Sequence, residues 1–282
     1  MNLHELQSKI EAWFKEKLAT APDTFFELFE QFLKALENGE IRSAEKSASG
    51  QWKANSWVKE GILLGFKYGV NQPLKSGEGF HFFDKHTYPI QPTAGHNKNI
   101  RIVPGGSSVR RGAYVGANVT MMPPMYINVG AFVDEGTMID SHALVGSCAQ
   151  VGKNVHLSAS AQLGGVLEPI NATPVIVEDN CMIGGNTGIY EGTQILEGAV
   201  IGSGAVLTRS TPLFDLVHNT IIRGSKDQPL IVPKGAVVVP GSRSIKGQAF
   251  SEEHGLSVQT PLIIKYRDDK TDTATKLEAL LR

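Results

Sequence analysis

The sequence has almost no excess charge of either sign and no long apolar run. Lysine and arginine number 27 and aspartate and glutamate 28, so no general electrostatic attraction to nucleic acid or to an anionic membrane is expected. No segment approaches the roughly 18 apolar residues of a membrane span. The first residues, MNLHELQSKIEAWFKEKLA, are charged throughout, unlike a signal peptide. We therefore expect a cytoplasmic protein without nucleic-acid or membrane partners.

Cysteine is scarce, and the histidines are not arranged as metal ligands. The two cysteines, Cys148 and Cys181, do not form a C-x-x-C pair, and in a reducing compartment we expect them to be buried free thiols. His142, His156 and His218 lack the close H-x-x-x-H type of spacing that binds zinc. No metal is therefore expected. The chain has 282 residues, 41% of them apolar, enough for a large core in one or two domains.

The N-terminal region has the apolar spacing of helices. Residues 3–36 predict two helices that Pro22 separates. Thr24 and Glu27 have capping-box spacing, and Gly39 is a typical helix end, because glycine adopts a left-handed turn without a Cβ clash.

Residues 50–90 are rich in aromatic side chains. They include Trp52, Trp57 and the stretch GFHFFDKHTYP at residues 79–89. We predict short strands and packed loops here, with the aromatic stretch in the core, because large aromatic side chains are more often buried than arranged as a ligand cage.

The middle of the chain repeats an aliphatic residue or methionine every six positions, a period of neither a helix nor an ordinary strand. The series runs without a slip from Val109 to Leu163, stops at GGVLEPINATP, and resumes from Val177 to Leu213, with a weaker return at Val232. Four residues after each aliphatic residue stands a mostly small one, and glycine, asparagine or aspartate often follows the aliphatic residue directly. The pattern predicts a parallel β-helix, in which three hexads make a triangular coil of about 18 residues.

In such a coil the aliphatic side chain fills the interior and the small residue fits where the triangle narrows. The glycine, asparagine or aspartate that follows the aliphatic residue is expected to tolerate the corner backbone. We divide the chain into an N-terminal helical and mixed α/β domain at 1–105, a β-helix at 106–245 and a C-terminal extension at 246–282. The extension is predicted to be a strand followed by an amphipathic helix that caps the coils.

Residues 126–185, from YINVGAFVDEGTMID to DNCMIGG, resemble the tetrahydrodipicolinate N-succinyltransferases, hexapeptide-repeat acyltransferases of bacterial diaminopimelate and lysine synthesis. Further matching strings, AEKSASGQW and WVKEGILLGF before the coils and VPKGAVVVPGS near their end, extend the resemblance over nearly the whole chain. VDEGTMID and GGVLEP are its most specific parts. Packing of hexads does not dictate the polar residues Glu135, Asp140, Gln150, Lys153 and Glu168.

The resemblance implies a left-handed β-helix and transfer of a succinyl group from succinyl-CoA to the amino nitrogen of tetrahydrodipicolinate. The products are N-succinyl-2-amino-6-oxopimelate and CoA, and no permanently bound cofactor is implied. It also implies a homotrimer whose active sites lie between neighbouring β-helices.

The reaction needs a base for the attacking amine and cations for a dicarboxylate acceptor. Asp140, in TMID, matches the active-site aspartate of the family, and Arg101, in RIVPGG, matches its substrate-binding arginine. By the residues alone, either could be an ordinary corner aspartate or a solvated cation. With the resemblance, we expect Asp140 to deprotonate the amine and both residues to bind substrate.

The segment GGNTGIYEG departs from the family pattern, because Gly188 stands in place of a proposed catalytic glutamate and Asn186 in place of an arginine. Glycine has no acid–base group. Either Glu191 or the substrate-binding candidate Glu168 substitutes, or the glutamate is dispensable, or the acyl preference has changed. His142 is a further candidate base, since imidazole titrates near neutrality, although a lone histidine is more often structural.

Candidate contacts for CoA are Gly184, Gly202, Ser203, Lys234 and Lys246. Other cations that could contact phosphate or succinate groups are weaker candidates, because most surface cations do neither; they are Arg110, Arg111, Arg209, Arg223 and Arg243.

Two other functions stay open: an acetyl-CoA-dependent N-acetyltransferase on the same fold, and a non-catalytic β-helix scaffold. GGVLEP and the intact TMID disfavour the scaffold, since structure alone favours an uninterrupted coil. The string GGNTG lies inside a hexad run and not between a strand and a helix, so it is not a phosphate-binding loop.

Overall fold

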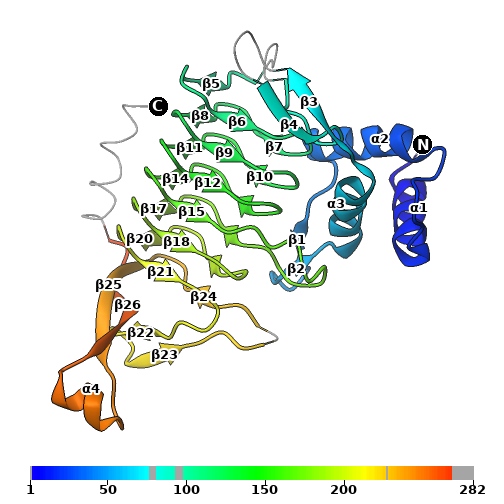
Figure 1. Cartoon of the computed structure of the whole chain (residues 1–282). Helices are drawn as coiled ribbons and strands as arrows, with labels where there is room; N and C mark the ends of the chain where they lie inside the picture. The colour runs from blue at the N-terminus through cyan, green and yellow to red at the C-terminus, as the bar shows by residue number, and fades with distance from the viewer. Residues whose placement is uncertain (1, 76–80, 93–97, 227, 269–282) are drawn as a thin grey trace.

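Residues 101–238 form a left-handed parallel β-helix of three sheets, as the hexads predict (Figure 1). The structure is a computed structural model that describes residues 2–75, 81–92, 98–226 and 228–268. The chain passes in turn through three sheets, here called A, B and C. We name the edges between them AB, BC and CA in chain order.

Each coil contributes one two-residue strand to each sheet. Sheet A consists of β6 (Ser108–Val109), β9 (Tyr126–Ile127), β12 (Leu144–Val145), β15 (Gln162–Leu163), β18 (Gly188–Ile189) and β21 (Val206–Leu207). Sheet B consists of β7 (Tyr114–Val115), β10 (Phe132–Val133), β13 (Gln150–Val151), β16 (Ile176–Val177), β19 (Gln194–Ile195) and β24 (Ile231–Val232).

Sheet C contains β5 (Arg101–Ile102), β8 (Thr120–Met121), β11 (Met138–Ile139), β14 (His156–Leu157), β17 (Met182–Ile183), β20 (Val200–Ile201) and β25 (Ala236–Ser244). Three more strands extend this sheet below the coils: β26 (Ser257–Tyr266), β22 (Leu213–Asp215) and β23 (Thr220–Ile222). The first parallel strand, β5, lies five residues before the start that the hexads suggested.

Every aliphatic position of the hexads lies inside the coil. None is more than 7% exposed, and the small residues four positions later are equally buried. Partners in neighbouring coils are 18 residues apart, as in Ile139 and Leu157. The spacing rises to 26 between Leu163 and Ile189 and to 37 between Ile195 and Val232. Both longer connections leave the coil at edge AB.

The corner residue that needs a left-handed backbone is not the one that we predicted. Positive φ angles occur three residues after the aliphatic position, as at Asn118, His142 and Asn154, and not directly after it. Glycine directly after the aliphatic position serves close stacking instead. A Cβ on Gly116 would lie 2.6 Å from the backbone nitrogen of Glu135 in the next coil.

Helices α1 (Leu3–Glu16) and α2 (Phe25–Glu37) confirm the two predicted helices. The predicted capping box at Thr24 is wrong. Its backbone is not extended and its side chain makes no capping bond, whereas Asn2 and Glu5 form such a box on α1. Gly39 has the predicted left-handed conformation, with a φ of 74°.

Between residues 50 and 90 the strands are present, but a helix was missed. Short strands in this region are β2 (Trp52–Ala54), β3 (Asn71–Lys75) and β4 (His81–Lys85), while Trp57 and GILLGF lie on α3 (Ser56–Tyr68). Strand β1 (Ala44–Lys46), just before this region, pairs with β2. Helix α3 is buried on several sides, which removes the amphipathic period that reveals a helix. The predicted aromatic core holds for Tyr88 but not for Phe82 and Phe83, which are 43% and 69% exposed.

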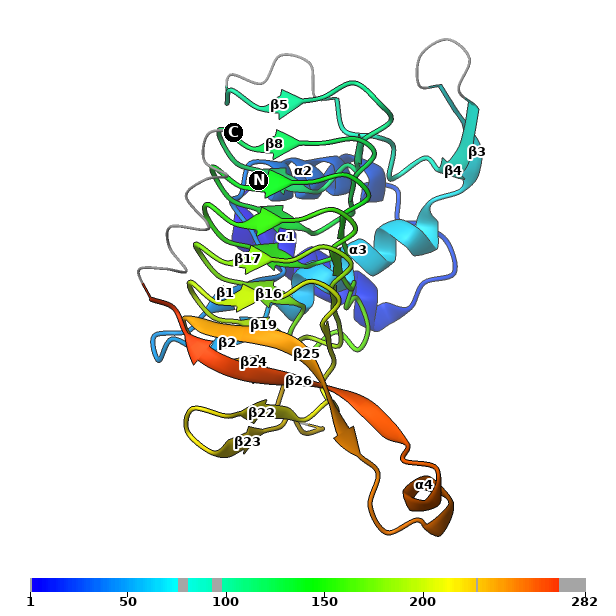
Figure 2. The ribbon, with the colours of Figure 1, turned by 90° about the vertical axis from the view of Figure 1, so that its left-hand side faces the viewer.

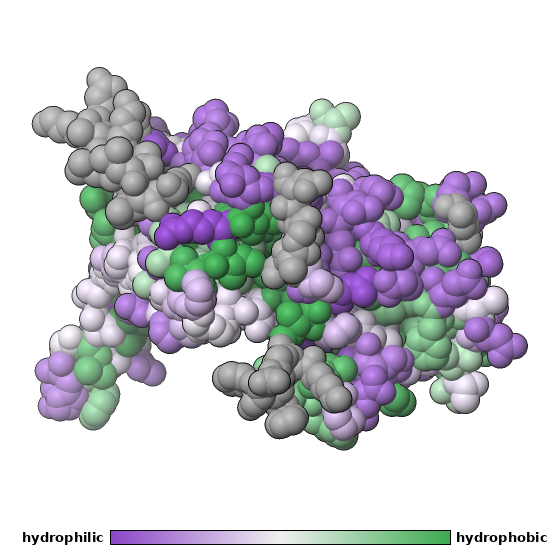
Figure 3. Space-filling model, turned by 90° about the horizontal axis from the view of Figure 1, so that it is seen from above, coloured by the Kyte–Doolittle hydropathy of each residue, from purple (hydrophilic) through white to green (hydrophobic). Residues whose placement is uncertain are grey.

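The N-terminal domain covers sheet B. The rings of Tyr114 and Phe132 stack on its outer face, with centroids 4.2 Å apart, and Arg111 forms ion pairs with Glu30 and Glu37 of α2. Figure 2 shows α1–α3 behind the stacked strands of sheet C. Seen from the β5 end, most of the surface over this domain is hydrophilic (Figure 3). Because the helices lie over sheet B, they leave sheet C and edge CA uncovered.

After the coils, β25 and β26 form a long antiparallel hairpin with α4 (Ala249–Glu253) at its tip, projecting from the body (Figures 1 and 2). Strand β26 confirms the predicted C-terminal strand, whereas the predicted amphipathic helix lies outside the described residues. No helix within the described ranges is long and apolar enough to cross a membrane. The two cysteines are buried free thiols, as expected, and burial raises the pKa of Cys181 to about 12.

Asp215 anchors the strands below the coils. Its carboxylate is 3% exposed and accepts hydrogen bonds from Tyr266 Oη at 2.7 Å and His218 Nδ1 at 2.8 Å. Burial opposes ionisation, but these bonds and two from backbone N–H groups prevail and lower the pKa to about 2. Because this pKa is below the value near 4 of an aspartate in the unfolded chain, the ionised Asp215 stabilises the folded protein at a pH above about 4. This stabilisation is lost as the pH falls from about 4 to about 2.

We expect Asp215→Asn to lower the free energy of unfolding at pH 7 by about 2–4 kcal/mol, because one carboxylate oxygen and the charge are lost. Urea denaturation of both proteins between pH 7 and pH 2 measures the effect. The difference in the free energy of unfolding between them should become smaller in acid. Asp23→Asn, at an exposed position, is the control with no expected change. A difference in the free energy of unfolding that stays constant with pH would contradict the stabilising role of the ionised Asp215.

Candidate active site

Edge CA brings together the predicted aspartate and most of the predicted CoA contacts. Asp140, Gly184 and Gly202 each follow a buried aliphatic residue, and each backbone N–H donates to a carbonyl of the next coil, at 2.9, 2.7 and 2.7 Å. Ser158 stands between Asp140 and Gly184 in this column, and Ser203 follows Gly202. From Ser158 to Gly202 the column therefore holds no side chain larger than serine, and Val239 follows below Gly202.

The Asp140 carboxylate is half-buried and held by one oxygen. Oδ1 accepts a hydrogen bond from the backbone nitrogen of Ser141 at 2.7 Å. Oδ2 has no hydrogen-bond partner among the described residues. One oxygen thus orients the group while the other can accept a proton.

His142 lies two residues further along the same edge, with an exposed side chain. Its φ of 62° places it at the left-handed corner position, and its backbone bonds to Pro124 and Gln162. No described side chain orients its imidazole, which a catalytic histidine ordinarily requires. The position therefore has a backbone role that the sequence did not reveal.

We expect His142→Gly to be at least as stable as the parent, because glycine avoids the roughly 1–2 kcal/mol of left-handed strain. Turnover should change by less than about threefold if imidazole is not the base. His142→Ala is the matched control, since it removes the imidazole but keeps the strain. Thermal melts and initial rates of the three proteins decide; a hundredfold loss of rate in both variants would make His142 catalytic.

The two long connections at edge AB line a cleft of about 620 Å³. It holds Glu168 and Glu191, together with Arg209, Lys226 and Tyr190. Glu191 Oε2 accepts a hydrogen bond from the backbone nitrogen of Arg209 at 3.1 Å. Sheet A separates this cleft from edge CA, and Glu191 lies a further two strand spacings, roughly 10 Å, along the stack from Asp140. Within one chain the structure does not bring these carboxylates together.

Tyr190 is a residue of this region that sequence reasoning missed. A Cβ on Gly188 would overlap its ring, and one on Gly164 would lie 2.7 Å from its Cδ1. The ring thus covers two glycines of neighbouring coils. It occupies the space in which a side chain at position 188 would stand.

Lys59 is a second missed residue. It is fully buried on α3, and its Nζ donates to the carbonyl of Ala172 at 2.5 Å. Burial lowers its pKa. This bond ties the connection that carries Glu168 to the N-terminal domain. Lys59 stands in the matching string WVKEGILLGF, but its burial was not predicted, because α3 itself was not predicted.

The predicted cations are dispersed. Arg101 is exposed on β5 and lines a cleft of about 400 Å³ with Asn99, Asn118 and Asn154. Strand pairing places it two strand spacings, roughly 10 Å, from the strand before Asp140. Lys234 instead pairs with Glu197 at edge BC, at 2.6 Å, and this bond raises its pKa. Lys246 is exposed on the projecting hairpin.

The remaining arginines differ in what they contact. Arg110 pairs with Asp84, and Arg111 with two glutamates of α2, so both attach the N-terminal domain to the coils. Arg223 and Arg243 are exposed. Among the described residues, no group of three or more histidine, cysteine, aspartate or glutamate side chains is placed to hold a metal ion.

Known proteins similar to this chain match over nearly its full length. Residues 5–68 match the family model "Tetrahydrodipicolinate N-succinyltransferase N-terminal", and residues 174–209 match "Hexapeptide repeat of succinyl-transferase". The 2,3,4,5-tetrahydropyridine-2,6-dicarboxylate N-succinyltransferase of Acinetobacter baylyi is 40% identical over 99% of both chains. That of Idiomarina loihiensis is 41% identical over 93% of this chain and 91% of the relative. A solved structure of a putative N-succinyltransferase from Campylobacter jejuni aligns with 86% of this chain and 64% of its own, with 16% identity and a TM-score of 0.42.

Proposed function

The chain belongs to the family of 2,3,4,5-tetrahydropyridine-2,6-dicarboxylate N-succinyltransferases, and from this premise we propose the reaction and its residues. The protein transfers the succinyl group of succinyl-CoA to the amino nitrogen of tetrahydrodipicolinate, in diaminopimelate and lysine biosynthesis. The acceptor ring is hydrated and opened. The amine attacks the thioester carbonyl, a C–N bond forms and the C–S bond breaks, giving N-succinyl-2-amino-6-oxopimelate and CoA.

Asp140 acts as the base. Its Oδ2, which has no partner among the described residues, takes the proton that the amine nitrogen loses as the amide forms, and the departing thiolate of CoA is then protonated. The oriented but open carboxylate of Asp140 is the observation that carries the proposal. Arg101 lies on β5 of sheet C, the sheet whose strand β11 directly precedes Asp140. It binds a carboxylate of the acceptor, because the guanidinium can donate two parallel hydrogen bonds to a carboxylate.

The CoA arm lies along edge CA. Gly184, Gly202 and Ser203 leave backbone close to the surface of this edge, and an extended chain with amide groups can approach such backbone closely. Lys234, at edge BC, and Lys246, on the projecting hairpin, lie away from edge CA and reach only the CoA bound to a neighbouring copy.

A homotrimer in the cytoplasm completes the site. The N-terminal domain covers sheet B, whereas edge CA and sheet A are not covered by its helices. Contacts between unlike surfaces related by a three-fold axis close into a ring. In such a ring edge CA of one copy faces sheet A and edge AB of the next, so Asp140 meets the neighbour's cleft with Glu168, Glu191 and Arg209. Light scattering should give three times the 30.4 kDa chain mass.

Release of the CoA thiol tests the reaction. The purified protein is given succinyl-CoA or acetyl-CoA, with and without tetrahydrodipicolinate or the stable acceptor 2-aminopimelate. We expect release only with succinyl-CoA and acceptor together. Release with acetyl-CoA but not with succinyl-CoA would instead favour the N-acetyltransferase, with the altered GGNTG segment as the cause of the changed donor. Absence of release with either donor would overturn the proposal.

A further inference from the structure

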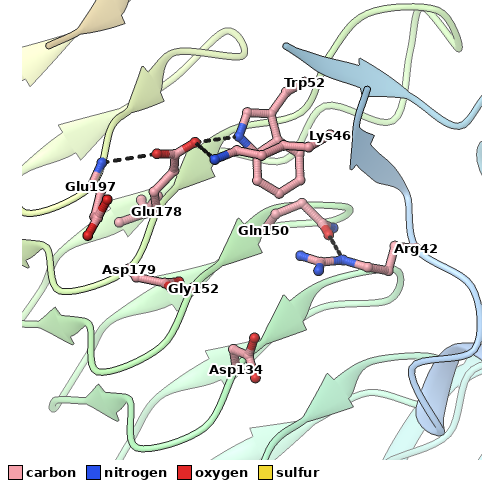
Figure 4. Close-up of a pocket in the computed structure, with 10 residues that line it drawn as sticks. Arg42, Lys46, Trp52, Asp134, Gln150, Gly152, Glu178, Asp179 and Glu197 are labelled. Atoms are coloured by element: carbon pink, nitrogen blue, oxygen red, sulfur yellow. Dashed lines mark hydrogen bonds and ion pairs between the residues drawn. The ribbon is translucent and has the colours of Figure 1, made fainter. Parts of the chain in front are cut away.

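A second polar pocket lies at edge BC, where the N-terminal strands β1 and β2 meet sheet B (Figure 4). Its volume is about 230 Å³. The matching string AEKSASGQW contributes Lys46 and Trp52 to its wall, and Arg42 precedes that string. Within one chain sheet C separates edge BC from edge CA, so none of these residues reaches Asp140 of the same copy.

One wall of the pocket is a closed hydrogen-bond network around Glu178. Its carboxylate pairs with Lys46 Nζ at 2.7 Å and accepts from Trp52 Nε1 at 2.8 Å and from the backbone nitrogen of Glu197 at 3.1 Å. Burial works against ionisation, but these donors lower the pKa of Glu178. Lys46 is therefore already neutralised, and Arg42 is the cation that remains for a ligand.

Arg42 is held rigidly but incompletely bonded. Its guanidinium lies 3.6 Å from the centre of the Phe132 ring, and Nε donates to Gln150 Oε1 at 3.0 Å. The amide of Gln150 donates to the carbonyl of Cys148 at 2.8 Å, which fixes its oxygen toward Arg42. Neither terminal nitrogen of Arg42 has a hydrogen-bond partner among the described residues. Figure 4 shows the guanidinium extending into the pocket.

A guanidinium in this state favours a carboxylate. Burial lowers the pKa of Arg42, although Asp134 opposes the shift, so the cation is partly stripped of water without a full set of acceptors. Two free terminal nitrogens in a fixed plane match the two oxygens of a carboxylate. Because stacking and the Nε bond already hold the side chain, little conformational entropy is lost on binding.

The opposite side of the pocket favours a cation. Asp134 and Asp179 each use Oδ1 to accept from a backbone nitrogen, that of Glu135 and that of Lys153, both at 2.8 Å. Their second oxygens have no hydrogen-bond partner among the described residues. Two other lining carboxylates, Glu178 and Glu197, already pair with Lys46 and Lys234. This leaves the carboxylates of Asp134 and Asp179 against the one guanidinium of Arg42 among the lining residues, so an occupant with net positive charge is favoured over a neutral or anionic one.

We propose that this pocket binds a basic α-amino acid, with its carboxylate on Arg42 and its ammonium groups toward Asp134 and Asp179. The volume is below the roughly 300–1,000 Å³ of pockets for drug-sized ligands, which suits a small metabolite. The occupant joins the N-terminal domain to the coils and so stabilises the folded protein in proportion to its saturation. The site is distinct from the transfer site, and its occupancy is measured without any acyl-CoA.

Isothermal titration and thermal melts with L-lysine as the probe test the proposal. We expect L-lysine to bind and raise the melting temperature at millimolar concentration. Cadaverine, which lacks the carboxylate, and L-glutamate, which has the wrong net charge, should do neither. Absence of L-lysine binding, or equal binding of L-glutamate or cadaverine, would overturn the assignment independently of whether the protein transfers succinyl groups.

Two substitutions locate the ligand. Arg42→Lys keeps the charge but loses the paired donors, and Asp134→Asn keeps the Oδ1 acceptor but loses the charge; each should weaken L-lysine binding about tenfold or more. Asp134→Asn guards against a loss due only to misfolding, since its corner bond is retained. Lys98→Met is the control, because Lys98 also lies over an aromatic ring, Tyr114 at 4.4 Å, but outside the pocket. Unchanged affinity in both pocket variants would show that L-lysine binds elsewhere.

Discussion

Replacement of Asp140 by asparagine is expected to lower kcat by about 10²–10⁴-fold, the range that loss of a positioned general base produces. The asparagine oxygen can still accept from the backbone nitrogen of Ser141, as Oδ1 does now. The corner and the coil should therefore persist. Initial rates of CoA thiol release, with circular dichroism and thermal melts beside them, separate a chemical defect from a folding defect.

Asn128→Asp is the matched control for this exchange. Asn128 also directly follows a buried aliphatic residue, and its Oδ1 also accepts from the next backbone nitrogen, that of Val129 at 2.8 Å. It lies at edge AB in a coil above the cleft and outside the proposed transfer machinery. Its exchange should leave turnover within about twofold. Turnover of Asp140→Asn equal to that of the parent would remove Asp140 from the mechanism and shift the search to Glu168 and Glu191 of a neighbouring copy.

Truncation of Leu157 to alanine is expected to lower the free energy of unfolding by about 2–5 kcal/mol. Leu157 is fully buried and pairs in register with Ile139 above and Ile183 below. The two neighbouring coils are held at strand spacing by backbone hydrogen bonds, so they cannot collapse into the space that the truncation leaves. Urea denaturation at a fixed protein concentration measures the loss.

Leu216→Ala serves as the comparison, since the same side chain is there 55% exposed. We expect a change within about 0.5 kcal/mol. If Leu216→Ala were as damaging as Leu157→Ala, the face around Leu216 would be buried in the assembled protein, and the contact between copies would involve the strands below the coils as well as the coils themselves.

The placement of the two long connections links fold to function. Both leave at edge AB, and together they enclose the largest of the three clefts described above. The sequence located both interruptions of the hexads, at GGVLEPINATP and between Leu213 and Val232. It did not show that they lie side by side, because they are separated by two intact coils in the chain and meet only when those coils stack.

The sequence by itself determined the coil. Its six-residue period identifies the side chains that face inward, because each hexad places one aliphatic side chain in the narrow interior of the triangular coil. It also indicated Asp140, through the resemblance of TMID to the active-site string of the family and not through the place of Asp140 in the hexad.

Only the tertiary structure decided which faces are covered and which polar groups meet. Helix α3 has no clear period because both the helices and the coils bury it, and Lys59, Tyr190 and Arg42 owe their environments to residues far away in the chain. The local period reports how a segment packs on its own coil. The covering of sheet B, the separation of Asp140 from Glu191 and the pocket at Arg42 depend instead on contacts between distant segments, which no local pattern records.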